Sequence, residues 1–98
     1  MRRVVEVGFV LEPGEYYIEF HGGDNSFHGI LDVEIDGTLI GDIDQYALNT
    51  VYPSVHKLRY RCTQSGPHVL VGTVARKRAE SKGFWNCLFK IVFMPLES

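Results

Sequence analysis

Residues 29–47 read GILDVEIDGTLIGDIDQYA, and this stretch decides the fold. Apolar residues at positions 31, 33 and 35 alternate with carboxylates at positions 32, 34 and 36. A repeat of two residues is typical of a half-buried β-strand, with one face apolar and the other acidic. Asp36 and Gly37 then supply the two left-handed backbone positions that a type I′ hairpin needs, and a return strand begins near Leu39. The stretch therefore predicts antiparallel β-structure.

Similar patterns on both sides of this hairpin predict further strands. Extended apolar segments at 3–11, 16–21, 51–62, 68–75 and 84–94 are separated by turn signals at roughly ten-residue spacing, and no helical period is sustained. Segment 41–49 loses the alternation, so we expect either one helical turn capped by Asp42 or an irregular crossing between two sheets. The chain of 98 residues is predicted to be a single all-β domain, an antiparallel β-sandwich spanning 1–98.

Composition narrows the classes of partner. Hydrophobic residues make up 45% of the chain and charged residues 22%, which is ordinary for a folded, soluble protein. The net charge of -2 argues against nucleic acid, because affinity for phosphates grows with the number of Lys and Arg contacts. No apolar run approaches the roughly 20 residues of a membrane span, and the N-terminal residues lack a signal-peptide pattern. We therefore expect no membrane segment and no targeting segment.

The cysteines and the polar loop at 21–29 bear on metals and redox chemistry. Cys62 and Cys87 lie in apolar strand patterns, which favours buried free thiols over a disulfide, and no Cys/His cluster offers a zinc site. Asp24 and Asn25 would form a turn in the loop HGGDNSFHG. Structural calcium is the weaker alternative, because the spacing matches no EF-hand loop.

Charged stripes suggest how the strands pair. The outward residues Lys57, Arg59 and Arg61 are expected to lie beside the acidic stripe at 32, 34 and 36 as exposed ion pairs. Segment 76–83, RKRAESKG, is either a solvated hairpin tip or a site for phosphate or an anionic glycan. Segments 68–75 and 84–94 are apolar on both faces, which predicts a central position in a sheet or an interface between copies of the chain.

Six short motifs carry a family resemblance. In order they are PGEYYIEF (13–20), LDVEIDG (31–37), IDQYA (43–47), SGPHVLVG (65–72), SKGFW (81–85) and IVFMP (91–95). This order resembles jelly-roll modules of the galactose-binding-like type, which include carbohydrate-binding modules and domains of bacteriophage tail and fibre proteins. The resemblance implies a non-catalytic binding or assembly role on a virion or an extracellular surface. At 98 residues the chain is short for that fold, in which additional loops usually carry calcium and sugar.

Two functions are compatible with these features, and the sequence contains no catalytic motif that competes with them. The first is glycan recognition, in which exposed aromatic rings stack on sugar faces and polar loop groups bond hydroxyls. The second is assembly with other protein subunits, as a homo-oligomeric viral or phage appendage or decoration protein. Exposure of Trp85 and Tyr52 separates the two, because buried rings would leave the first function without a platform. The candidate ligand-binding residues are Asp24, Asn25, His28, Tyr46, Tyr52 and Trp85.

Overall fold

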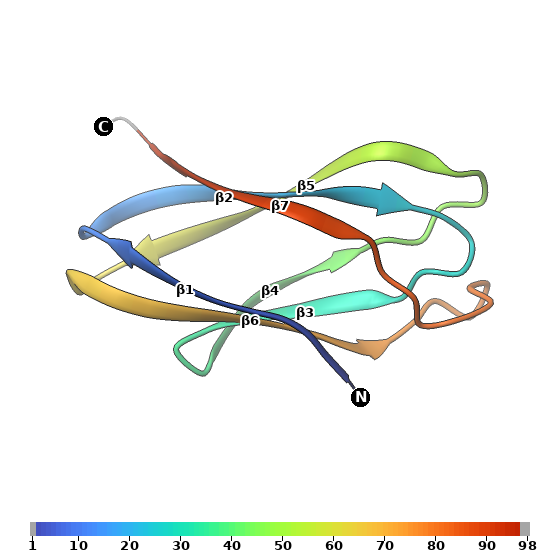
Figure 1. Cartoon of the computed structure of the whole chain (residues 1–98), viewed down its shortest axis with the longest axis horizontal. Helices are drawn as coiled ribbons and strands as arrows, with labels where there is room; N and C mark the ends of the chain where they lie inside the picture. Colours follow the sequence, from blue (N-terminus) through green and yellow to red (C-terminus); the bar gives the residue numbers. More distant parts are fainter. Residues whose placement is uncertain (1, 97–98) are drawn as a thin grey trace.

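The computed structural model describes residues 2–96 as a sandwich of two antiparallel sheets (Figure 1). One sheet has the strand order β1-β6-β3-β4 and the other the order β5-β2-β7. The strands are β1 (Arg2–Leu11), β2 (Gly14–Asp24), β3 (Ile30–Ile35), β4 (Thr38–Asp44), β5 (Val51–Cys62), β6 (Gly66–Arg76) and β7 (Leu88–Pro95). The predicted all-β, two-sheet architecture in one compact domain is confirmed.

The β3–β4 hairpin forms as its sequence predicts. Asp36 and Gly37 both have positive φ, 52° and 83°, and Ile35 pairs directly with Thr38 across the turn. The apolar face of β3 is fully buried, while Glu34 on the opposite face is exposed. The alternation of this strand therefore fixes which face turns toward the second sheet.

The core lies between the two sheets and is made by strands from both. Ile18 and Phe20 from β2 meet Leu31 and Val33 from β3, together with Leu70 from β6, and all of these side chains are almost completely buried. Burial of large apolar side chains is the main favourable term in folding. The two sheets are held together by this layer, because no backbone ladder joins them in the described part of the chain.

Strand pairing is nested around the β3–β4 hairpin. β3 pairs with β4, β2 with β5 and β1 with β6, while β6 also pairs with β3, and β7 adds to the free side of β2. β1 and β7 are thus the edge strands on the same side of the sandwich, where the rings of Phe9 and Phe93 lie 4.5 Å apart. Each of the two outer strands leaves one side of its backbone without a strand partner in residues 2–96.

Three boundaries differ from the sequence predictions. No helical turn forms at 41–49: β4 continues to Asp44, and only 45–50 make the irregular crossing to the second sheet. β2 runs to Asp24, so the polar loop is shorter than predicted and spans 25–29. The last strand begins at Leu88, which leaves Phe84 and Trp85 in the preceding loop.

The predicted pairing of the basic stripe with the acidic stripe is wrong. β5 lies in the other sheet and pairs with β2, so Arg59 contacts Glu15 at 3.2 Å and Lys57 contacts Glu19 at 3.7 Å. Asp32, in the acidic stripe of β3, instead forms an ion pair with Arg76 of β6. Cross-strand pairs form only between strands of one sheet, and sheet membership is not encoded in the local pattern.

The positions of β6 and β7 and the state of the two cysteines can also be compared with the sequence predictions. β6 occupies the predicted central position, between β1 and β3, whereas β7 is an edge strand. Cys62 and Cys87 are free thiols, as predicted. Within residues 2–96 there is no helix whose length and apolarity would let it cross a membrane.

Candidate functional site

Three loops meet at one end of the sandwich, on the right in Figure 1. They are 25–29 between β2 and β3, 45–50 between β4 and β5, and 77–87 between β6 and β7. The Asn25 N–H donates to the Gln45 carbonyl at 3.1 Å, and the Ala47 N–H donates back to the Asn25 carbonyl at 3.1 Å. These backbone bonds join the first two loops as a short parallel bridge.

The third loop is anchored on the first through its backbone and one serine. The Lys82 N–H donates to the Ser26 carbonyl at 2.8 Å, and the buried Ser81 hydroxyl donates to the His28 carbonyl at 2.7 Å. Gln45 adds a cross-link from the second loop, because its Nε2 donates to the Cys87 carbonyl at 2.8 Å. The loop end is therefore a hydrogen-bonded unit and not a set of separate hairpin tips.

Trp85 presents an exposed ring on a fixed backbone. Its N–H donates to the Phe27 carbonyl at 3.0 Å, and its carbonyl accepts from the Gly29 N–H at 2.9 Å. The side chain nevertheless is 70% exposed. An aromatic ring held out from an ordered backbone loses little conformational entropy when a ligand packs on it.

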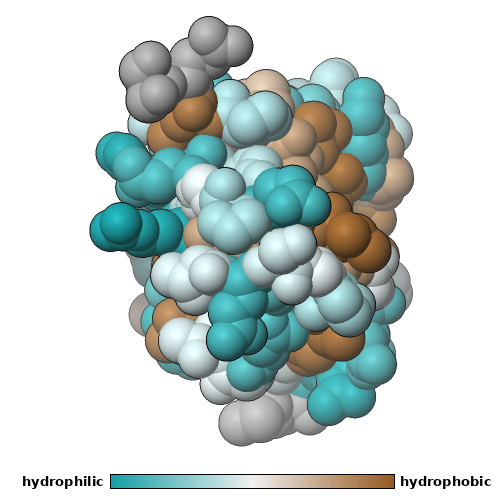
Figure 2. Space-filling view, turned by 90° about the vertical axis from the view of Figure 1, so that its left-hand side faces the viewer, coloured by the Kyte–Doolittle hydropathy of each residue, from teal (hydrophilic) through white to brown (hydrophobic). Residues whose placement is uncertain are grey.

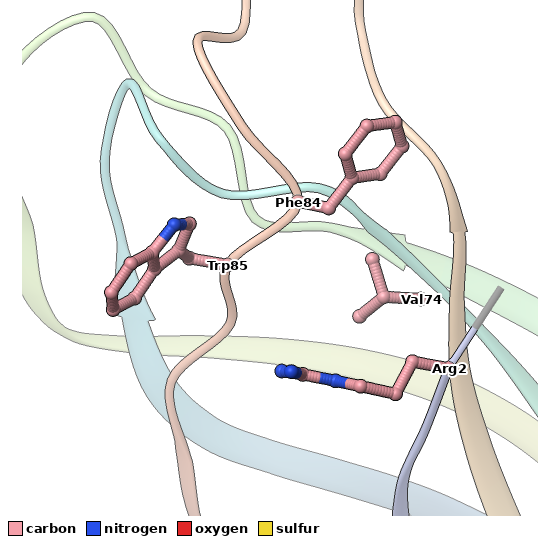
Figure 3. Close-up of a pocket in the computed structure, with 4 residues that line it drawn as sticks. All are labelled: Arg2, Val74, Phe84 and Trp85. Carbon is pink, nitrogen blue, oxygen red and sulfur yellow. The ribbon is translucent and has the colours of Figure 1, made fainter.

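Trp85 forms one wall of a cavity of about 550 Å³. Phe84, Val74 and Arg2 form the remainder of the lining. Figure 3 shows Arg2 reaching from β1 past Val74 toward the Trp85 side of the cavity. The site thus combines two aromatic side chains from the β6–β7 loop with one cation from the first strand.

The other aromatic rings at this end already have partners. Lysine or arginine side chains of segment 77–82 lie 5.4–5.9 Å from the ring centroids of Tyr46, Phe84 and Phe27. Tyr52 lies 5.9 Å from Phe89, centroid to centroid, on β5 and β7. Among residues 2–96, no such aromatic or cation partner is found for the Trp85 ring.

The six predicted ligand residues occupy different environments. Asp24 and His28 are only 9% and 6% exposed and are engaged inside the protein: Asp24 accepts from Ser54, and His28 Nδ1 lies 2.9 Å from the Gly23 carbonyl. The Asn25 side chain accepts from the Phe27 N–H within its own turn. Tyr46 is half-buried, whereas Tyr52 is 66% exposed like Trp85. Only the last two rings present large free surfaces.

A second cluster lies at the opposite end of the sandwich, the end that faces the viewer in Figure 2, where hydrophilic and apolar residues are interspersed. His68 Nδ1 lies 2.6 Å from the carboxylate of Asp36, and His68 Nε2 lies 2.8 Å from the Gln64 carbonyl and 3.5 Å from Cys62 Sγ. This cluster was not predicted from the sequence, because Cys62, His68 and Asp36 share no local motif and are brought together only by the pairing of distant strands.

The second cluster differs from a nucleophilic site in two respects. Both His68 nitrogens face oxygen acceptors, so the imidazolium can donate to both, and no lone pair is then left to accept a proton from the thiol. Cys62 is 2% exposed, and its Sγ lies 3.2 Å from the Gln64 carbonyl as a donor. The arrangement therefore ties the β3–β4 turn to the β5–β6 turn.

We expect this tie to make stability depend on pH. The hydrogen bond to Asp36 and that to Gln64 raise the pKa of His68 above 6.5, and the bonds from His68 and from the Val69 N–H lower the pKa of Asp36 below 3.8. The contribution of His68 to the free energy of unfolding is fully present below pH 6.5 and is lost as pH rises through the folded-state pKa of His68. The contribution of Asp36 to the free energy of unfolding is fully present above pH 3.8 and is lost as pH falls through the folded-state pKa of Asp36.

Urea unfolding at pH 5, 7 and 9 measures this dependence. The free energy of unfolding is expected to fall from pH 5 to pH 9 in the wild type and to change less in Asp36→Asn. Asparagine is a matched replacement, because it tolerates the left-handed turn position that Asp36 occupies. An equal decline in both proteins would show that His68 and Asp36 are not the groups responsible.

Comparison of this chain with protein-family models, with curated proteins and with solved structures found no match. Within residues 2–96, there is also no group of three or more His, Cys, Asp and Glu side chains arranged to hold a metal ion.

Proposed function

We propose that the protein is a non-catalytic saccharide-binding module whose main contact is Trp85. The observation that carries this proposal is the exposed indole, which lies beside the cavity of about 550 Å³ and has no ring or cation partner among residues 2–96. Pockets of this order accommodate small ligands. The indole supplies a flat apolar surface of the kind that packs against the C–H face of a pyranose, and Phe84 supplies a second aromatic wall.

The strand order supports a jelly-roll assignment, with the relation to galactose-binding-like modules and phage tail or fibre domains as part of the same proposal. The pairs β3–β4, β2–β5 and β1–β6 are nested, as in a long two-stranded hairpin that wraps into two sheets. Such wrapping is how jelly rolls distribute consecutive strands between sheets. β7 would be an addition to this pattern on the free side of β2.

Intrinsic fluorescence offers a direct test, since Trp85 is the only tryptophan in the chain. Titration with saccharides selected on a glycan array is expected to change the intensity or the emission maximum of this single reporter. A glycan array without hits, together with unchanged fluorescence at millimolar sugar, would refute the proposed function.

Trp85→Ala is expected to weaken binding of an array-selected saccharide by about tenfold or more, because stacking on one aromatic ring contributes on the order of 1–3 kcal/mol in comparable ligand contacts. Calorimetry is the suitable measurement, since the variant lacks the fluorophore. Tyr17→Ala is the matched control: Tyr17 is an exposed aromatic residue of β2 that does not line the cavity. Equal affinity of Trp85→Ala and wild type would exclude Trp85 as the platform.

Assembly with a second copy of the chain is the other candidate function. It is favoured by the two edge strands β1 and β7, which lie on the same side of the sandwich. β1 and β7 border a groove of about 330 Å³ lined largely by apolar residues such as Val5, Val7 and Ile91. Backbone groups along edge strands can pair with another chain. A stable oligomer in native mass spectrometry that Val7→Lys dissociates would support assembly; a monomer at high concentration would refute it.

A further inference from the structure

Arg2 is an exposed residue at the start of β1, and its position there lies on the inner face of the sheet. It is the antiparallel partner of Val74, whose side chain belongs to the buried core. Directly opposed residues of an antiparallel pair have their side chains on the same face of the sheet. The Arg2 side chain therefore leaves β1 on the inner face, at the end of the sandwich that the β6–β7 loop covers, and enters the cavity shown in Figure 3.

Among the residues that the structure describes, the guanidinium of Arg2 is the only charge in this cavity lining. Arg76 and Arg78, which lie at the same end of the molecule, are neutralised by Asp42 at 2.9 Å and by Asp44 at 2.5 Å respectively. Arg2 forms no ion pair with any carboxylate in residues 2–96. Its cavity neighbours are Val74, Phe84 and Trp85, none of which carries a negative charge.

We infer that the saccharide is acidic and that Arg2 binds its carboxylate while the sugar ring packs on Trp85. This inference rests on the proposed function and names the class of saccharide. A guanidinium presents parallel N–H donors whose spacing matches the two oxygens of a carboxylate. Because Arg2, Phe84 and Trp85 are exposed, the affinity contributed by this pair is expected to fall as ionic strength rises. Uronic acids and nonulosonic acids carry both a carboxylate and a pyranose ring.

The charges around the cavity also favour an anion. Segment 76–83 contributes Lys77, whose Nζ lies 5.9 Å from the centre of the Phe84 ring, and the exposed Lys82. Glu80 is the only acidic residue in that segment. Surface cations of this kind attract an anionic ligand over about 10 Å at moderate salt, and the attraction falls as ionic strength rises.

Matched sugar pairs test the inference in the full chain. Calorimetry compares methyl glucuronide with methyl glucoside, and N-acetylneuraminic acid with its methyl ester. The wild type is expected to bind at least one acidic sugar about tenfold or more tightly than its neutral partner, as befits hydrogen bonds to a charged group. Arg2→Gln is expected to remove that difference, because it weakens the binding of the acidic sugar by about tenfold or more and that of the neutral partner by much less.

Arg3→Gln is the matched control, because Arg3 is the next residue, is exposed, and already pairs with Glu6 at 2.8 Å. It is expected to retain the preference for the acidic sugar. Circular dichroism and thermal melting establish that both variants fold. A third probe, galactose 6-sulfate, separates the anion classes: binding as tight as that of the carboxylates would overturn the assignment to a carboxylate.

Two other outcomes would overturn the inference, and they differ from failure of the proposed function. Equal affinity of the wild type for acidic and neutral partners, or an unchanged preference in Arg2→Gln, would refute the role of Arg2 while saccharide binding stands. Absence of binding to every sugar, acidic or neutral, would refute the proposed function itself.

Discussion

Gly22→Ala is expected to lower the free energy of unfolding by about 3 kcal/mol or more, at the upper end of what overpacking costs. A Cβ at Gly22 would overlap the carbonyl oxygen of Cys87 and lie 2.8 Å from its carbonyl carbon and 3.2 Å from Cα of Leu88. These are backbone atoms, so rotation of a side chain cannot relieve the overlap. The start of β7 must instead move away from β2.

The same substitution is expected to weaken the loop end. The Cys87 carbonyl accepts from Gln45 Nε2 and from the Gly23 N–H, and Trp85 lies two residues before it in the chain. A displaced Cys87 would break these bonds and shift the platform. Saccharide affinity is therefore expected to fall together with stability.

Urea unfolding followed by circular dichroism measures the effect, and Gly8→Ala is the matched control. A Cβ at Gly8, also within a strand, would meet only the His68 carbonyl oxygen at 3.9 Å, an ordinary contact. That variant is expected to be as stable as the wild type or more stable by up to about 1 kcal/mol, since alanine restricts the unfolded chain. Wild-type stability of Gly22→Ala would contradict the close approach of β2 and β7.

Local patterns predicted the strands well because their causes are local. The alternation at 31–35 and the Asp36-Gly37 turn depend on residues within a few positions of one another, and both are as expected. The choice of partner strand is different. β5 pairs with β2 and not with the acidic strand β3, and the ion pair between Glu15 and Arg59 joins residues 44 positions apart. Neither charge stripe alone distinguishes these partners.

β-Bulges explain why the inward position of Arg2 and the sidedness of β7 could not be predicted from the sequence. An irregularity between Arg3 and Val5 shifts the register of β1, so that Arg2 faces inward although simple alternation from Val5 would turn it outward. A second irregularity, between His21 and Gly22, affects the pairing with β7. Leu88 there packs on the core and Phe89 is exposed, opposite to what simple alternation from Ile91 would give. One extra residue reverses the sidedness of the rest of the strand.

The sequence predicted where the loops lie better than it predicted what their polar side chains do. Glycine, polar or charged residues interrupt the strand patterns at 21–29, 41–49 and 76–83, and the loops at these places do meet at one end. The roles of the polar residues could not be predicted, because burial depends on contacts with distant strands. Asp24 is buried against residues of β5 that lie 30 and 32 positions later. The ligand role of the six candidates stays a prediction.

Asp24→Ala is expected to destabilise the fold by about 3 kcal/mol, because the buried carboxylate satisfies two neighbours. The Ser54 hydroxyl donates to it at 3.1 Å, and His56 Nε2 lies 3.0 Å from each of its oxygens. Bonds to a charged acceptor are stronger than neutral ones, and their loss would leave two polar side chains without their partner in the sandwich.

Denaturant unfolding of Asp24→Ala, with saccharide titration well below its melting temperature, separates a structural role from ligand contact. Asp42→Ala is the matched control: Asp42 is exposed, and its partner Arg76 retains Asp32, so stability close to wild type is expected. A structural Asp24 predicts lower stability with unchanged affinity in the folded protein. Unchanged stability with lost affinity would instead make Asp24 a ligand contact, because its carboxylate would then be needed by the sugar and not by Ser54 and His56.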